Sequence, residues 1–289
     1  MKAPGETALA PARRRRAWNW AEFPKQLLML LAAAAILVPG YFLVITPLKT
    51  QTNYSLSKLG FPSPIVFDNF VTALRGGRFF LWFGNSIIMV VGALAVSTAV
   101  STLAAFAMAR MEFRGRNLLL SVSNALMVLP PVVMIIPLFL FFSDLRLTST
   151  YPAAILVYAG LVTPFSIYML TNFFRTVPHE IMESALMDGA SSLDILLQIL
   201  LPLSAPALMT MIVVNAMWVW NDLLIALVLL PDDAKRTLMV GITVFGTRYN
   251  SDVPVSMAGM LMASLPMLLL YIFGQRYFTR GLVAGAVKG

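Results

Sequence analysis

Acidic side chains gather in one short stretch of an otherwise basic chain. Residues 175–198 contain one basic residue and four acids, which are Glu180, Glu183, Asp188 and Asp194. The whole chain carries a formal net charge of +8. Carboxylates in this setting can form ion pairs with a basic partner, so the stretch is a candidate binding segment. It also holds His179, the one histidine of the sequence, and there is no cysteine, which excludes histidine-cluster and thiolate metal sites.

The spacing within this stretch predicts a short amphipathic helix, a turn and a second helix. Pro178 and the acids after it favour a helix start, because the macrodipole attracts carboxylates. The apolar stripe consists of Ile181, Met182, Ala185, Leu186 and Gly189, and the other face of Glu180, Glu183, Ser184, Met187 and Asp188. Gly189 is predicted to supply a left-handed exit from the helix. Ser191 and Asp194 are predicted to form a capping box for a second helix, which is expected to end or bend at Pro202.

An acidic amphipathic helix suits a protein partner better than a lipid surface. The inner leaflet of a membrane is anionic, so a helix lying on it should be basic. A groove in a protein would bury the apolar residues and pair the carboxylates with basic side chains. A solvated loop without a partner is the alternative interpretation.

A second group of polar and aromatic side chains lies inside an apolar segment. It consists of Asn215, Trp218, Trp220, Asn221 and Asp222. An acid at membrane depth is costly and marks a functional site, which predicts a substrate path here. The competing interpretation is an interfacial belt in which Trp and Asp mark the outer membrane face. The sequence leaves both open.

The elements that position these groups are apolar segments of membrane-spanning length. The chain of 289 residues is 59% hydrophobic and only 12% charged, with a mean hydropathy of +0.81. A span needs about 20 apolar residues. Charge-free runs of that order are Gln26–Leu48, Phe79–Ala109, Asn117–Ser143, Leu147–Phe174, Ile195–Asn221 and Val253–Gln275. The sequence therefore predicts an all-α polytopic membrane protein with six transmembrane helices.

The distribution of basic residues predicts the orientation of the chain. Arginines cluster near the N-terminus and between the second and third spans, as the positive-inside rule expects of cytosolic segments. The basicity is thus explained by topology rather than by nucleic acid. We expect a disordered basic cytosolic tail (1–25), a first helix with an outer loop (26–80), a transmembrane core (81–276) with a cytosolic loop at 175–202, and a cytosolic C-terminal tail (277–289).

Several spans carry further local signals. Small residues recur every four positions in the second span, at Ala93, Ser97, Ser101 and Ala105, which predicts close helix packing. Prolines predict bends or breaks in the third and fourth spans. The fifth span is expected from about residue 203 to 230, followed by an outer loop over 231–252. A short surface helix is expected over Phe67–Leu74.

The acidic loop resembles the Glu-Ala-Ala loop of binding-protein-dependent ABC importer permeases. The shared pattern is Glu183-Ser184-Ala185, then Gly189, and Ile199-x-Leu201-Pro202 after nine more residues, with Ser184 in place of the usual Ala. Phe83-Gly-Asn-Ser-Ile, Trp220-Asn-Asp and the ending from Gln275 to Gly289 resemble the maltose-type (MalG-like) carbohydrate branch. Together these stretches cover about residues 81 to 289.

The resemblance implies a type I ABC importer fold with both termini cytosolic in the bacterial cytoplasmic membrane. It implies a dimer of ABC ATPase subunits, a second permease and an extracytoplasmic solute-binding protein as partners. In that family the loop is a coupling helix, so Glu183 would face the ATPase and Gly189 would form the turn. Ile199, Leu201 and Pro202 would pin the second helix to the bundle. No catalytic residue, cofactor or metal is implied, and ATP hydrolysis belongs to the partner.

Three other functions can be compared with sugar import: import of another solute, ion-coupled transport and membrane enzyme activity. The resemblance implies import of a mono- or oligosaccharide, with a polyol or glycerol phosphate as the alternative. An ion-coupled secondary transporter should show paired intramembrane acids, whereas only Asp222 qualifies. An integral-membrane enzyme should show clustered His, Asp or Lys at one membrane face, and no such cluster occurs in the sequence.

Overall fold

The computed structural model describes the backbone of residues 23–75, 78–248 and 252–286, and side chains in the same ranges except 244–248 and 276–286. Most of the predicted N-terminal tail therefore lies outside the described residues. The described residues form helices and connecting turns, and no strand occurs among them.

The chain divides into two compact units, with the boundary between Phe42 and Leu43. The first unit contains most of α1 (Phe23–Ile45), an apolar helix with Pro39 inside it and no buried side chain.

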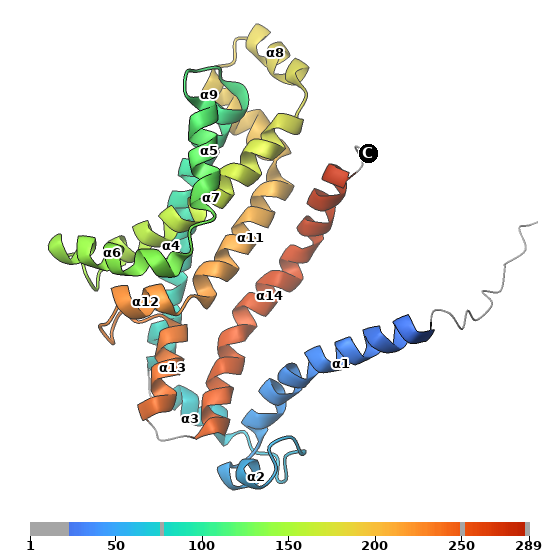
Figure 1. Cartoon of the computed structure of the whole chain (residues 1–289), viewed down its shortest axis with the longest axis vertical. Coiled ribbons are helices and arrows are strands. Elements are labelled where there is room, and N and C mark those ends of the chain that lie inside the picture. Colours follow the sequence, from blue (N-terminus) through green and yellow to red (C-terminus); the bar gives the residue numbers. More distant parts are fainter. Residues whose placement is uncertain (1–22, 76–77, 249–251, 287–289) are drawn as a thin grey trace, which may run out of the picture. The chain divides into compact units, whose positions relative to one another are not determined.

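The second unit contains all the other elements (Figure 1), namely η2 (Thr46–Leu48), α2 (Gln51–Leu56), α3 (Asp68–Arg75), α4 (Arg78–Arg110), α5 (Arg116–Leu126), α6 (Pro131–Asp144), α7 (Tyr151–Thr176), α8 (His179–Met187), α9 (Ser192–Asp194), the π-helix η3 (Ile195–Leu200), α10 (Leu201–Leu203), α11 (Ala205–Asn221), α12 (Leu224–Leu229), α13 (Leu238–Arg248) and α14 (Val253–Ala286). The expected surface helix over Phe67–Leu74 corresponds to α3.

Four described segments are long and apolar enough to cross a membrane, which are Phe23–Leu48, α4, α7 and Val253–Gln275. Two further candidates are bent pairs: α5 with α6 at 100°, and Ser192–Leu203 with α11 at 77°. The described spans reach the predicted six if each bent pair crosses the membrane once. The first break follows from Pro130, which is extended (ψ 127°), and from Pro131, which starts α6 without a backbone donor.

Three elements differ from the sequence prediction. The fifth span ends at Asn221 rather than near residue 230, because the Asp222 carboxylate accepts the backbone N–H groups that begin α12. The loop predicted over 231–252 contains α13, whose Leu238 and Val240 are completely buried. Helix α14 continues past residue 276 to Ala286. Pro164 lies inside α7 without breaking it.

The core is built on α4 and α7, which pack along each other. The stripe of small residues in α4 is buried, with Ala93, Ser97, Ser101 and Ala105 each at most 1% exposed. Small side chains let the two backbones approach closely, as helices in lipid require. Helix α11 packs against α4, α7 and α14, so the segments on either side of the acidic loop, α7 and α11, belong to one bundle.

Candidate functional site

Helix α8 is bounded at both ends by local signals in its own sequence. Pro178 is extended (ψ 142°) and precedes the first helical residue, so it is the N-cap rather than part of the first turn. At the other end Gly189 has φ +84°, in the left-handed region. Ala190 N–H donates to Ala185 O and Gly189 N–H donates to Leu186 O, both at 3.0 Å. This pair of hydrogen bonds is a Schellman motif, which ends the helix where the sequence predicted.

The capping box predicted for the second helix is present. Asp194 N–H donates to Ser191 Oγ at 3.2 Å, and Ser191 N–H donates to Asp194 Oδ2 at 3.0 Å. Ser184, the departure from the Glu-Ala-Ala pattern, donates its hydroxyl to Glu180 O at 2.8 Å within α8. The hydroxyl is thereby satisfied inside the helix, and the turn of helix is kept.

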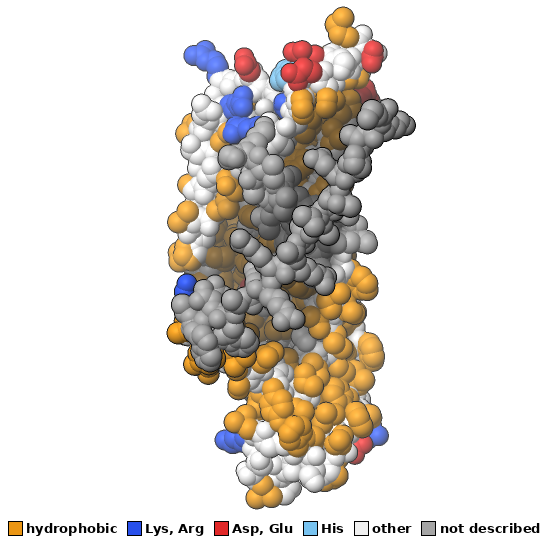
Figure 2. Space-filling model, turned by 90° about the vertical axis from the view of Figure 1, so that its right-hand side faces the viewer, with side chains coloured by type: hydrophobic (Ala, Val, Ile, Leu, Met, Phe, Trp, Pro, Cys, Tyr) orange, Lys and Arg blue, Asp and Glu red, His pale blue; other side chains and the backbone are white. Residues whose placement is uncertain are grey.

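One side chain holds α8 against the bundle, and most of the others are exposed. Met182 is 5% exposed and packs in an apolar cluster with Phe174, Val177 and Ile195. Ile181 and Leu186 are exposed, so the predicted apolar stripe is only partly buried within this chain, and Met187 on the other face is exposed as well. Helix α8 lies at the top of Figure 1, at one end of the second unit. Figure 2 shows Asp and Glu side chains gathered at the same end.

Glu183 is exposed on this surface. Its Oε1 lies 3.3 Å from Nδ1 of His179, one helical turn earlier. A surface pair at this spacing contributes little to stability, so Glu183 is available to a partner at small cost.

The segment after α9 is anchored mainly by residues that sequence reasoning did not select. In the π-helix η3, Ile195, Leu196 and Leu200 are at most 3% exposed, whereas Ile199 and Leu201 are partly buried. Pro202 is exposed. The wider π-turn rotates successive side chains differently from an α-helix, so an α-helical period does not identify these buried positions.

Arg110, the last residue of α4, binds the end of α7 that leads into α8. Its Nη2 donates to Phe174 O, near the end of α7, and to Val177 O, in the connection between α7 and α8. The carbonyls at a helix C-terminus carry a partial negative charge, which a guanidinium complements with positive charge and hydrogen bonds. Sequence analysis uses the arginines of this region only to predict topology, because the partners of Arg110 lie 64 and 67 residues away.

The five residues predicted for the substrate path lie in different surroundings. Asn215 is buried, and its Nδ2 donates to Ser166 Oγ at 2.8 Å. Trp220 is buried and donates from Nε1 to Ala263 O in α14 at 3.1 Å. Asn221 is exposed and bonds within its own helix to Met217 O. Trp218 is 37% exposed.

Asp222 has a structural role that explains its polarity. Its Oδ2 accepts hydrogen bonds from the N–H groups of Ile225 at 3.0 Å and Ala226 at 3.2 Å. Tyr158 of α7, a fully buried residue that sequence reasoning missed, donates its hydroxyl to the same oxygen at 2.8 Å. The carboxylate therefore caps α12 and joins it to α7. The Asn-Asp pair is a local signal for such a cap, but nothing in the sequence indicates Tyr158.

The Phe83-Gly-Asn-Ser-Ile motif of α4 binds the connection between α12 and α13. Asn85 Nδ2 donates to Ala234 O and Arg236 O at 2.9 Å, while its Oδ1 accepts from Tyr151 Oη. Leu238 N–H donates to Ser86 Oγ at 2.8 Å. Phe83 meets Trp220 edge to face at 5.5 Å, so two of the motifs noted in the sequence touch each other.

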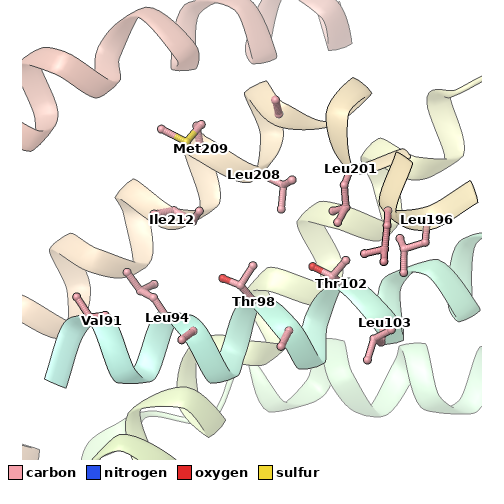
Figure 3. Close-up of a pocket in the computed structure, with 14 residues that line it drawn as sticks. Val91, Leu94, Thr98, Thr102, Leu103, Leu196, Leu201, Leu208, Met209 and Ile212 are labelled. Atoms are coloured by element: carbon pink, nitrogen blue, oxygen red, sulfur yellow. The ribbon is translucent and has the colours of Figure 1, made fainter. Parts of the chain in front are cut away.

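A large apolar groove of about 840 Å³ lies between α4 and the segment from η3 to α11. Figure 3 shows Thr98 and Thr102 beside apolar side chains that include Leu94, Leu196, Leu201, Leu208, Met209 and Ile212. The groove thus borders the bend at Ser204, where the bent pair changes direction. Among the described residues no group of three or more His, Cys, Asp or Glu could hold a metal ion.

The comparison with known families decides what this arrangement belongs to. Residues 97–281 match the model for the "binding-protein-dependent transport system inner membrane component". This chain belongs to that family. The permease is 41% identical over 253 residues to an ABC transporter permease protein, ORF2, of Caldicellulosiruptor sp., covering 87% of this chain and 92% of that one. It is 32% identical over 264 residues to the melibiose/raffinose/stachyose import permease MelC of Bacillus subtilis, covering 91% of this chain and 95% of that one.

A solved structure gives the same fold. The permease matches a chain in the crystal structure of a bacterial ABC transporter involved in the import of the acidic polysaccharide alginate, with a TM-score of 0.81 at 23% identity. The match covers 91% of this chain and 99% of the other. The permease therefore has the type I ABC importer fold, as the sequence predicted.

Proposed function

We propose that this permease is one subunit of an ATP-driven importer that moves a sugar across the bacterial cytoplasmic membrane by alternating access. In this proposal the chain crosses the membrane six times, with both bent pairs counted as spans and both termini cytosolic. A dimer of ABC ATPase subunits, a second permease and a solute-binding protein complete the transporter.

The observation that carries the proposal is the exposed acidic helix α8, which is held at fixed points to a bundle with a 77° bend beside it. Met182 and Arg110 fix the helix and its base, while Glu183, Leu186 and Met187 face outward. Such a surface suits a groove with basic walls in the ATPase. Closure of the ATPase dimer pushes α8, and η3 passes the displacement to α11 through the bend at Ser204. The bundle then changes its access from one side to the other.

The substrate class rests on the relatives. MelC is named for melibiose, raffinose and stachyose, and the structural neighbour imports a polysaccharide. A sugar is therefore the favoured solute, with a polyol or glycerol phosphate as the alternative. A secondary transporter is disfavoured, because Asp222 is occupied as a helix cap instead of being paired with another intramembrane acid.

The test is a charge reversal on α8 in the complete transporter reconstituted in proteoliposomes. We expect Glu183→Lys to weaken ATPase binding by roughly tenfold or more, since a charge that loses its partner at an interface costs about 2–5 kcal/mol. ATP-dependent sugar uptake should fall in parallel. Asp144→Lys is the matched control, because it makes the same charge change at an exposed acid at the end of α6, outside α8, and should leave both ATPase binding and uptake unchanged. Normal ATPase binding and uptake in Glu183→Lys would exclude this coupling surface.

A further inference from the structure

The turn between α4 and α5 forms a small pocket that contains both signs of charge. The pocket has a volume of about 320 Å³ and is lined by Glu112, Phe113, Gly115, Arg116, Asn117 and Leu118. Gly115 has φ +91°, a left-handed conformation that lets the chain reverse into α5 immediately before Arg116. None of these six residues has a part in the coupling surface or in the predicted substrate path.

The two charged side chains of this pocket are not paired with each other. Among the residues that the structure describes, neither Glu112 nor Arg116 forms an ion pair, and Arg116 makes only a long hydrogen bond of 3.5 Å from Nη1 to Met111 O. A carboxylate and a guanidinium that line one pocket without neutralising each other complement a ligand that itself carries both charges. A simple anion would be repelled by Glu112, and a simple cation by Arg116.

The pocket continues onto an exposed apolar face. Leu118, which lines the pocket, is 68% exposed, and Leu119 and Val122 farther along α5 are 49% and 48% exposed. Leu118 and Val122 are four residues apart and share one side of the helix. Phe113 in the turn is also exposed. A small soluble zwitterion would use only the polar part, whereas a lipid uses the pocket for its headgroup and the apolar face for its acyl chains.

We propose that this pocket binds a phospholipid whose headgroup carries a phosphate and a primary ammonium, as phosphatidylethanolamine does. Arg116 holds the phosphate, because a guanidinium donates charge-assisted hydrogen bonds to phosphate oxygens. Glu112 accepts hydrogen bonds from the ammonium group. A choline headgroup carries the same charges but has no N–H to donate, so it cannot make the second contact. The proposal does not depend on which solute the permease carries.

The experiment measures lipid binding to the full chain, purified in detergent with the subunits that accompany it, by native mass spectrometry. The probes are dioleoyl phosphatidylethanolamine, phosphatidylcholine and phosphatidylglycerol. We expect the wild type to bind the ethanolamine lipid about tenfold more tightly than the choline lipid, which corresponds to one charge-assisted hydrogen bond. Glu112→Gln should abolish that preference, and Arg116→Gln should weaken both lipids. Arg114→Gln is the matched control, because Arg114 is exposed in the same turn but does not line the pocket.

Several outcomes would overturn the proposal. Equal binding of the ethanolamine and choline lipids to the wild type would show that the ammonium is not recognised. Stronger binding of phosphatidylglycerol that is unchanged in Glu112→Gln would indicate a site for anions alone. An Arg114→Gln effect as large as that of Arg116→Gln would indicate general attraction to the basic turn. Thermal unfolding of each variant in the same detergent separates loss of binding from loss of the fold.

Discussion

At the scale of single residues, Gly189 has the most sharply defined requirement. Its φ of +84° places it in the left-handed region, and a Cβ added there would meet no atom within 4 Å. The cost of a side chain is therefore conformational rather than steric. Other residues pay about 1–2 kcal/mol in this conformation, and asparagine pays less than most.

This distinction gives a prediction with a matched control. Gly189→Ala should lower the free energy of unfolding by about 1 kcal/mol and reduce ATP-coupled uptake, with Gly189→Asn milder than Gly189→Ala. Gly160 in α7 also has no atom within 4 Å of an added Cβ, but its φ is not positive. Gly160→Ala should therefore be neutral or stabilising by about 0.5–1 kcal/mol. Thermal unfolding in detergent and uptake in proteoliposomes measure both effects, and equal losses in the two alanine variants would contradict the backbone argument.

Residues whose partners lie nearby in the sequence were predictable, and those with distant partners were not. The glycine exit and the Ser191–Asp194 capping box depend on atoms within a few positions, so composition and spacing indicate them. The hydrogen bonds of Arg110 and Tyr158 cross more than 60 residues. Their roles follow from which helices meet, and a single sequence does not specify those meetings.

At the scale of elements, apolar length locates the membrane segments but does not determine where each helix stops. Pro130–Pro131 is a local breaker, and the break it predicts occurs between α5 and α6. The apolar run after Trp220 contains no such breaker, so it was predicted to continue to residue 230. The helix ends at Asn221 because the Asp222 carboxylate accepts hydrogen bonds from the first N–H groups of α12. Tyr158 of α7 donates a further hydrogen bond to the same carboxylate and stabilises this arrangement.

The role of Asp222 at the break between α11 and α12 can be tested with a variant that keeps the hydrogen-bond acceptor of its side chain but removes its negative charge. Asp222→Asn keeps an oxygen for the N–H groups of Ile225 and Ala226 and should retain most of the transport activity. Asp222→Ala removes the cap, which costs about 0.5–2 kcal/mol, and should lower both thermal stability and uptake while the subunits still assemble. Measurements on purified transporter and proteoliposomes compare the two. If Asp222→Asn is as inactive as Asp222→Ala although its stability is unchanged, then the charge itself is required, as the substrate-path prediction would have it.

At the scale of the whole molecule, the acidic helix α8 and the helices that follow α1 lie at opposite ends of α4. Helix α8 and the α4–α5 turn lie at one end of α4, while α2, α3 and α13 lie at the other (Figure 1). Between these ends the described spans expose apolar side chains, including Val91, Leu103 and Leu156. This arrangement matches a bilayer, which accepts apolar side chains along its depth and polar ones only at its surfaces. The orientation in the membrane then depends on which of the two ends faces the cytosol.

The absence of cysteine from the sequence makes the orientation directly measurable, because any introduced cysteine is the single thiol of the chain. Ser192→Cys places it beside α8 and Ser55→Cys places it in α2, and both positions are exposed. With a membrane-impermeant maleimide, we expect Ser55→Cys to react in intact spheroplasts and Ser192→Cys to react only in inside-out vesicles. Ser166→Cys, buried between helices, should react in neither. Labelling of Ser192→Cys in intact spheroplasts would reverse the orientation, which would move α8 away from cytosolic ATP and remove the basis for its coupling to an ATPase.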